Sequence, residues 1–312
     1  MRRFVIAGAV VLVAAAAVFL GLRYFGGTVI DDFPPGALND YLPGDTAAVV
    51  TLDLKVLRDR NLLDKSLGKS LRAALAKDEV GLPFPLFGVD PAVDVDTLRL
   101  DFSAGDSGQP LVLLHGRFDR TRFKVGTGQL EEMKQDGFRL YRDDSVGGDT
   151  TLALACDTLV ASLARPRVVA ALRQAAGQRA MTRADDRLKG MLATVDRKRA
   201  LWFALDLAKL GRPPLPPSIE AQLHPIFEEA DTMSGGVAWG EELKADVTFT
   251  TRSEANARRL ESHLKNVVRF ADALVLIYRG EEYERVLLRL LADAQVTHHG
   301  TDVTLHSQLG LE

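Results

Sequence analysis

AAVVTLDL, residues 47–54, is a run of apolar and β-branched residues that closes on an aspartate and a leucine. A second run, ALWFALDL at residues 200–207, closes in the same way, so that Asp53 and Asp206 occupy matching positions. Short apolar runs rich in β-branched and aromatic residues are typical of buried strands. The two runs therefore predict two strands of one kind, each at the start of its own part of the chain.

The likeness extends beyond these runs. Residues 96–105 align without a gap with residues 231–240. On both sides the expected elements follow one order: strand, helical region, strand, hairpin turn, strand and helix. A repeated order of elements indicates an internal duplication, and it assigns residues 41–198 to a first half and residues 199–312 to a second.

The residue pattern also predicts how the strands pair. Within residues 97–102, leucine and phenylalanine alternate with threonine, arginine and aspartate, which is typical of half-buried antiparallel strands. Strands joined by short turns argue against a doubly wound nucleotide-binding fold. We expect an α+β fold, with helices packed on a largely antiparallel sheet that is built from two similar halves. Whether the halves share one sheet is left open.

Several individual elements are expected. The clearest helix begins after Ser253, a good N-cap residue, and a second follows over residues 281–294. Residues 295–307 predict a hairpin that turns near Gly300. Earlier helices are expected from Arg165 and over residues 185–195.

Residues 4–22 are nineteen consecutive uncharged and mostly apolar residues between Arg2-Arg3 and Arg23. A helix of that length, at about 1.5 Å per residue, crosses a hydrocarbon core of roughly 30 Å. Cleavage as a signal peptide is one fate, since alanines at 14–17 offer small residues for processing. The apolar run continues past them to Leu22, which favours a retained anchor.

The flanking charges predict the orientation of this anchor. Basic residues precede the span and acidic residues follow soon after it, so we expect the N-terminus inside and the body outside the cytoplasm. Residues 1–27 form the anchor or signal segment, and residues 28–40, with Pro34-Pro35, form a short tether. The lipid bilayer is thus an expected partner through residues 4–22.

The composition of the body excludes some partners. Removing the three arginines of residues 1–27 leaves 36 basic against 42 acidic side chains, a net charge of about −6. An acidic body without a basic stripe argues against nucleic acid as a partner. The single cysteine, Cys156, allows no intramolecular disulfide and is interpreted as a buried small side chain.

The motifs that suggest catalysis do not assemble. Ser107, in GDSGQP, resembles a serine-protease nucleophile, but the first histidine of the chain is His115, after the serine. A strand-to-strand turn explains that segment. Gly68-Lys69-Ser70 lacks the preceding glycine of a phosphate-binding loop, because position 63 is leucine.

Asp53 and Asp206 are the most notable polar residues, because each follows a strand and precedes a helical pattern. We interpret them as helix caps, with a paired-carboxylate active site as the alternative. Arg117 with Asp119, and Arg252 with Glu254, are predicted to form ion pairs at strand ends. Trp202 and Trp239 are predicted to be sheet aromatics rather than a sugar-binding platform.

The histidines do not predict a metal site. With Gly300-Thr301 as the turn, His299 opposes Asp302, His298 lies beside Val303 on the other face, and His306 pairs with Gln295. His306 is then roughly 13 Å from His299, too far to share a zinc ion at about 2 Å from each nitrogen. His115, His224 and His263 have no ligand-type partner at useful spacing and are interpreted as structural.

Residues 42–46, LPGDT, lead into the first strand and are followed by FGVDP at residues 87–91 and by Asp94. Over residues 42–120 this arrangement resembles uncharacterised, membrane-anchored bacterial proteins. The resemblance implies an extracytoplasmic protein with a single anchor. It implies no activity and no functional residue.

We therefore expect a membrane-tethered, periplasmic or extracellular domain that serves binding, scaffolding or envelope maintenance, with an envelope protein as partner. No catalytic residue, cofactor or metal is predicted. Two alternatives stay open: an envelope hydrolase that uses Asp53 and Asp206, or Ser107, and a carrier of an apolar ligand.

Overall fold

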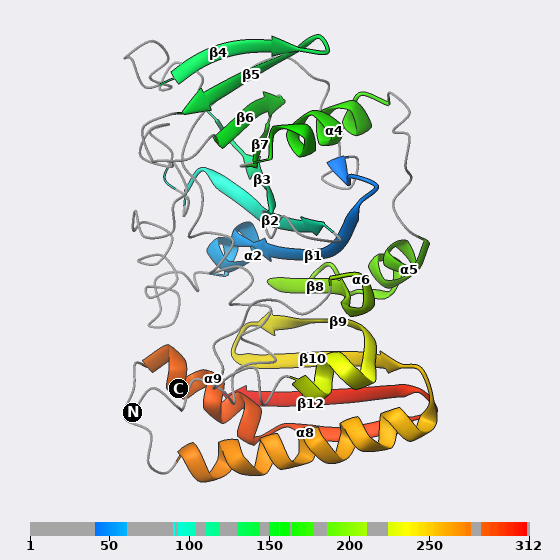
Figure 1. Ribbon diagram of the computed structural model, residues 1–312. Coiled ribbons are helices and arrows are strands. Elements are labelled where there is room, and N and C mark those ends of the chain that lie inside the picture. The colour runs from blue at the N-terminus through cyan, green and yellow to red at the C-terminus, as the bar shows by residue number, and fades with distance from the viewer. Residues whose placement is uncertain are drawn as a thin grey trace. The chain divides into compact units, whose positions relative to one another are not determined.

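The structure is a computed structural model, and it divides the chain into two compact units that meet in sequence at Asp186 and Arg187. Each unit is described by itself (Figure 1). The described residues are 41–60, 90, 93–103, 110–118, 130–143, 150–155, 157–162, 164–177, 186–210, 224–275 and 282–310.

The first unit contains an antiparallel sheet in the order β1-β2-β3-β7-β6-β5-β4. Its strands are β1 (Thr46–Asp53), β2 (Val95–Ser103), β3 (Leu111–Gly116), β4 (Leu130–Gln135), β5 (Phe138–Asp143), β6 (Thr150–Ala155) and β7 (Thr158–Ser162). Its described helices are α2 (Leu54–Asp59) and α4 (Arg165–Ala175).

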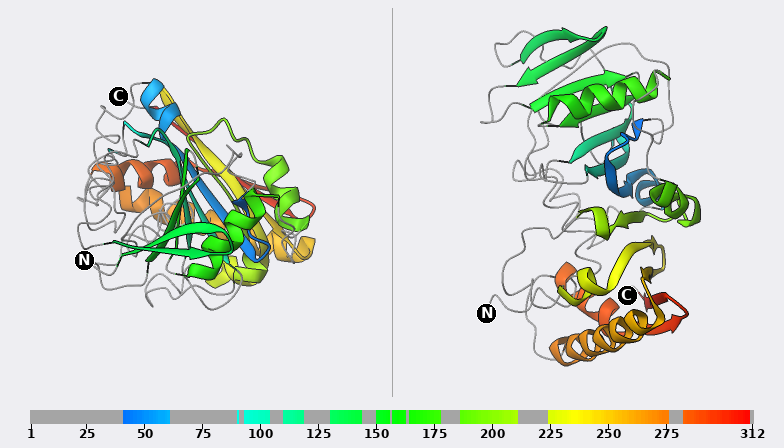
Figure 2. Two further views of the ribbon diagram at one scale, coloured as in Figure 1. Left: turned by 90° about the horizontal axis from the view of Figure 1, so that it is seen from above. Right: turned by 45° about the vertical axis from the view of Figure 1, so that its right-hand side comes forward.

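Helix α4 packs on β6 and β7 (Figures 1 and 2). The strands and the helix both contribute apolar side chains to the core between them. Proline lies in its first turn, where the missing N–H costs nothing. The core combines alternate strand residues with the inner side of the helix, including Leu113, Leu140, Val160, Val168 and Leu172. The prediction of half-buried strands is wrong for β2, because Arg99 and Asp101 of its expected polar face pair with each other and are fully buried.

The second unit contains an antiparallel sheet in the order β11-β12-β10-β9-β8. Its strands are β8 (Leu201–Asp206), β9 (Ala230–Trp239), β10 (Glu242–Thr251), β11 (Gln295–His299) and β12 (Asp302–Gly310). Its helices include α5 (Asp186–Thr194), which begins at the boundary, α6 (Leu207–Leu210), α8 (Glu254–Val275) and α9 (Glu282–Ala292), and residues 224–229 are also helical.

Helices α8 and α9 lie on one face of this sheet (Figures 1 and 2). Alternate residues of β10 and β12, such as Val247, Phe249 and Leu305, are buried there. The intervening residues point to the other face and are partly or fully exposed. We call this second face the open face: Ser234, Ala238, Lys244, Asp246, Thr248, Thr250, Gln295, Thr297, His299, Thr304, His306 and Gln308.

The fold is therefore α+β with antiparallel pairing, as predicted. Helices α4, α5, α8 and α9 and the C-terminal hairpin appear where the sequence places them. The hairpin turns at Gly300, whose φ of 59° lies in the left-handed region that glycine tolerates. Its register pairs His299 with Asp302 and Gln295 with His306, which confirms the predicted geometry.

The two units also share a strand register. In β1-β2-β3, Asp53 lies opposite Thr97 and Thr97 opposite His115. In β8-β9-β10, Asp206 lies opposite Thr232 and Thr232 opposite Thr250. The offset inferred from the sequence matches Thr97 with Thr232 and His115 with Thr250. This equality of register fits an internal duplication, which itself stays a prediction, as do the boundaries of the predicted halves.

Within the described residues, no helix is both long and apolar enough to cross a membrane. Several predictions concern residues that lie outside the described part of the chain: the anchor at residues 4–22, the tether at residues 28–40, Gly68-Lys69-Ser70, Ser107 and Cys156.

Candidate functional site

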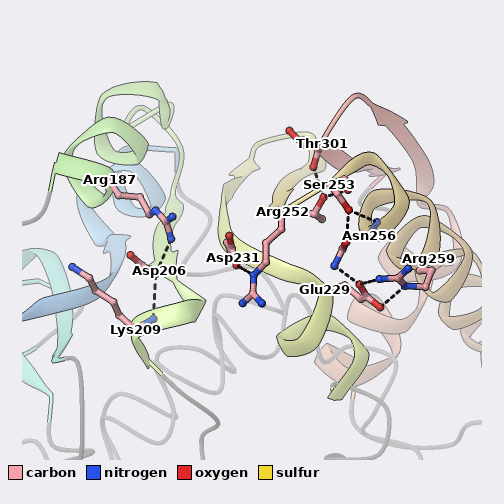
Figure 3. A network of polar contacts seen from close by, with 11 residues as sticks. Arg187, Asp206, Lys209, Glu229, Asp231, Arg252, Ser253, Asn256, Arg259 and Thr301 are labelled. Atoms are coloured by element: carbon pink, nitrogen blue, oxygen red, sulfur yellow. Dashed lines mark hydrogen bonds and ion pairs between the residues drawn. The ribbon is translucent and has the colours of Figure 1, made fainter.

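The two strand-end aspartates cap helices. Asp53 Oδ1 accepts a hydrogen bond from the Val56 backbone N–H at 2.8 Å, at the start of α2. Asp206 Oδ1 accepts one from the Lys209 N–H at 3.2 Å, at α6 (Figure 3). Both predicted caps are confirmed. The aspartates belong to different units, so the alternative of a paired-carboxylate site stays a prediction.

Asp206 is the more deeply buried of the two, with 1% of its surface exposed. Arg187 of α5 approaches its Oδ1 at 3.7 Å (Figure 3), which is an ion pair without a hydrogen bond. The second oxygen, Oδ2, is buried with no hydrogen-bond partner. Asp206 is thus held by a cap and a nearby guanidinium.

Ion pairs at the start of α8 differ from the prediction. Arg252 Nε donates to Asp231 Oδ1 at 2.7 Å (Figure 3). Glu254 instead pairs with Arg258, one helical turn ahead. The predicted pair between Arg252 and Glu254 is therefore wrong. Glu254 opens the helix and has a partner at i+4, while Arg252 directly follows β10 and lies beside the neighbouring strand.

Glu229 is the centre of the polar contacts shown in Figure 3. Its two oxygens accept from Arg259 Nε and Nη2 at 2.7 and 2.8 Å, and Oε2 also accepts from Asn256 Nδ2 at 2.7 Å. Ser253 Oγ caps the same helix by accepting from the Asn256 N–H at 3.2 Å. The hydrogen bond and charge of Arg259 lower the pKa of Glu229. These contacts join the segment before β9 to the first turns of α8.

A second polar group crosses the open face, and we call Arg199, Asp246 and His306 the clasp. Asp246 Oδ2 receives Arg199 Nη2 at 2.5 Å, and its Oδ1 lies 2.5 Å from His306 Nδ1. Arg199 Nη1 also donates to the Gly236 carbonyl at 2.8 Å. The clasp therefore links the segment before β8 to β9, β10 and β12.

The clasp depends on the glycine beneath it. A Cβ on Gly236 would lie 2.9 Å from Arg199 Cδ and 2.5 Å from the Leu201 carbonyl oxygen. Glycine is thus required where the arginine lies flat on β9. Burial acts to raise the pKa of Asp246, but hydrogen bonds from His306 and Arg199 outweigh it and lower that pKa.

Three other histidines each lie near a different acidic residue. His298 Nδ1 lies 2.7 Å from Glu261 Oε2 of α8, on the helix-covered face, away from His306 on the open face. His224 lies 3.3 Å from Glu228, and His115 lies 3.5 Å from Asp157. In the part of the chain that the structure describes, no three metal-ligating side chains converge.

The first unit buries an ion pair that has no sequence signal. Arg99 Nε and Nη2 donate to the two oxygens of Asp101 at 2.6 and 2.8 Å, and both side chains are fully buried. Arg167 of α4 donates to the Asp101 backbone carbonyl at 3.1 Å and lies 3.5 Å from Asp45. Burial raises the pKa of Asp101 despite Arg99. This group ties α4 to β2.

Both tryptophans lie in strands of the second unit. Trp202 is buried in β8 beneath the Arg197 guanidinium, which lies 5.8 Å from the ring centre. Trp239 ends β9 and is half-buried. Arg117 donates to the Val93 carbonyl at 3.0 Å, while its predicted partner Asp119 lies outside the described residues.

Comparison with known proteins finds only weak similarity between this chain and solved structures. No family model and no curated protein matches this chain. Crystal forms I, III and IV of TP0453, a Treponema protein, are similar at TM-scores of 0.42, 0.44 and 0.44, with identities of 8%, 8% and 7%. The alignments cover 87%, 87% and 88% of this chain and 92%, 93% and 94% of those chains. At this level, no residue role or function is transferred.

Proposed function

We propose that this chain is a membrane-tethered, extracytoplasmic module that binds a protein of the cell envelope and does not catalyse a reaction. The observation that carries the proposal is the open face of the second unit. Four neighbouring strands present polar, accessible side chains there, while their other face is buried under helices. A partner that covers this face gains hydrogen bonds without any rearrangement of the sheet.

The chemistry of the open face suits recognition. Ser234, Thr248, Thr304 and Thr297 lie opposite one another in register and form one row of hydroxyl groups across four strands. The next row contains Asp246 and His306 of the clasp. Hydroxyls both donate and accept hydrogen bonds, and the clasp fixes the charged groups in place. Such a surface offers a partner directional contacts with little net charge.

The tether supports the same proposal. Nineteen apolar residues at 4–22, followed by a proline-containing segment, would hold the body close to the outer surface of the membrane. A fixed distance from the bilayer is useful for a binding or scaffolding role. Because Asp53 and Asp206 each use a carboxylate oxygen in a helix cap, the hydrolase alternative gains nothing from their geometry.

Thiol labelling in intact cells tests the location. In a Cys156→Ser chain, Gln308→Cys places a thiol at an exposed position of the open face. We expect a membrane-impermeant maleimide to label it before lysis, and the chain to stay in the membrane pellet. The matched Arg3→Cys chain should be labelled after lysis alone. Labelling of Gln308→Cys that requires lysis would reject the extracytoplasmic placement.

Photo-crosslinking tests the binding surface. A photoreactive amino acid at Lys244, exposed on the open face, should give a discrete protein adduct in native membranes. The same group at Ser262, exposed on α8, is the matched control and should give none. Absence of an adduct at Lys244, or equal adducts at both positions, would reject the open face as the binding surface.

A further inference from the structure

Strand β11 (Gln295–His299) is the last strand of the sheet in the second unit. All five of its residues pair with β12 without a register shift. Among the described residues, no strand pairs with its other side. Its outer backbone edge therefore has the geometry of a template for a further strand.

This edge lacks three of the usual devices against strand pairing. Proteins commonly guard edge strands with charged side chains, proline or a bulge. β4, the terminal strand of the first unit, follows that rule with Glu131, Glu132 and Lys134, all exposed. The sequence of β11, QVTHH, contains no acidic residue, lysine, arginine or proline, and its pairing with β12 shows no bulge.

Contacts on the helix side hold β11 in place. Val296 is buried, and His298 Nδ1 lies 2.7 Å from Glu261 Oε2 of α8. Glu261 also accepts Lys265 Nζ at 2.7 Å, which fixes the carboxylate from the other side. Gln295, Thr297 and His299 point to the open face and are exposed. The strand is thus fixed by one set of side chains and accessible through the other.

We propose that β11 pairs antiparallel with β11 of a second copy of this chain, about a two-fold axis at Thr297. Thr297 then meets Thr297 of the second copy, Val296 meets His298, and Gln295 meets His299. No residue of like formal charge lies opposite another in this register. A two-fold axis uses the same surface twice, so one unprotected edge satisfies both copies.

The hydroxyl row of the open face favours this occupant over an unrelated strand. Thr297 ends the row that begins at Ser234 and runs through Thr248 and Thr304. Pairing at Thr297 continues the row directly into the second copy, where cross-strand threonine pairs add to the sheet. Five paired residues make a small interface. Two copies held on one membrane have a high effective concentration, which favours their pairing. That last step rests on the proposed tether.

Cysteine crosslinking in native membranes tests the pairing with the full chain. In a Cys156→Ser background, Thr297→Cys places two thiols across the axis, where Cα separations of about 4.5–5.5 Å suit a disulfide. We expect mild oxidation to give a dimer on a non-reducing gel. The control, Gln308→Cys, is exposed on β12 away from the axis and should stay monomeric.

The register has its own test. Gln295→Cys alone should stay monomeric, because two Gln295 positions lie about 13 Å or more from each other along the strands. The combination Gln295→Cys and His299→Cys should crosslink. Monomers throughout, or equal dimer yields for Thr297→Cys and Gln308→Cys, would overturn the proposal. Membrane fractionation of the same samples shows separately whether the tether holds.

Discussion

Asp53 and Asp206 hold equivalent places in two different units. Each ends a strand, lies opposite a threonine of the neighbouring strand, and accepts the backbone N–H three residues ahead. The equivalence explains why both positions carry aspartate, since a short carboxylate reaches the exposed N–H groups at a helix start. It also explains the recurrence of an aspartate after each strand, which is the sequence pattern that suggests a paired-carboxylate active site.

Replacing these aspartates should cost stability. Asp53→Ala should lower the free energy of unfolding by about 1 kcal/mol, because the first turn of α2 loses its cap. Asp53→Asn retains a capping oxygen and is the matched control, with a much smaller loss. Urea unfolding checks both variants. An Asp53→Ala chain as stable as the wild type would contradict the cap.

The buried pair of Arg99 and Asp101 should behave as a unit. Asp101→Leu alone leaves a guanidinium buried without its carboxylate, and we expect a loss of about 3–5 kcal/mol. Arg99→Met with Asp101→Leu removes both charges and should be more stable than either single variant. A double-mutant cycle of unfolding free energies measures the difference. Additive losses would show that the two side chains are not coupled.

Two glycines should respond to alanine in opposite directions. A Cβ on Gly235 would lie 2.1 Å from the Asp246 carbonyl oxygen, so Gly235→Ala should be strongly destabilising. Gly190, in α5, has open space around that position and should gain stability by about 0.5–1 kcal/mol as alanine. Thermal melting compares the two variants directly. Equal effects would contradict the tight approach of β9 and β10.

Acid should weaken the second unit through Glu229 and Asp246. Both carboxyls have pKa values below those of the unfolded chain, about 4.3 and 3.9. Their contribution is therefore present above those values and is lost as the pH falls through the lower, folded pKa. We expect Glu229→Gln to lower stability at pH 7 and to flatten the loss below about pH 4.3.

The matched control for Glu229 is Glu241→Gln, at an exposed position of the turn between β9 and β10. Its stability profile between pH 3 and 7 should follow that of the wild type. Unfolding measured across this range checks both variants. A Glu229→Gln profile parallel to the wild type would show that the contacts of Arg259 and Asn256 do not stabilise the charged form.

Local patterns were enough to predict many elements but not their long-range contacts. The C-terminal hairpin is readable because alternation and Gly300 specify strand and turn within a few residues. The pair of Glu229 and Arg259 joins residues 30 positions apart, and no local spacing marks it. The wrong pairing of Arg252 with Glu254 has the same cause, since the neighbouring strand supplies Asp231.

The clasp shows most clearly which contacts the sequence does not predict. His306 and Asp246 are 60 positions apart in sequence and meet because β12 lies beside β10. The sheet order that brings them together is a property of the whole unit and leaves no trace in either segment. Gly236 is a partial signal, because glycine within a strand indicates a close approach of another group.

The central claim is that this protein works by binding an envelope protein through the open face of its second unit. The most direct measurement is the yield of the protein adduct from a photoreactive group at Lys244, in chains with the natural clasp and with Arg199→Met. The methionine leaves Gly236 in place but removes the guanidinium from Asp246, and it should reduce the adduct several-fold in folded, membrane-bound protein. An adduct yield that is independent of the clasp, or no adduct from the natural chain, would contradict the claim.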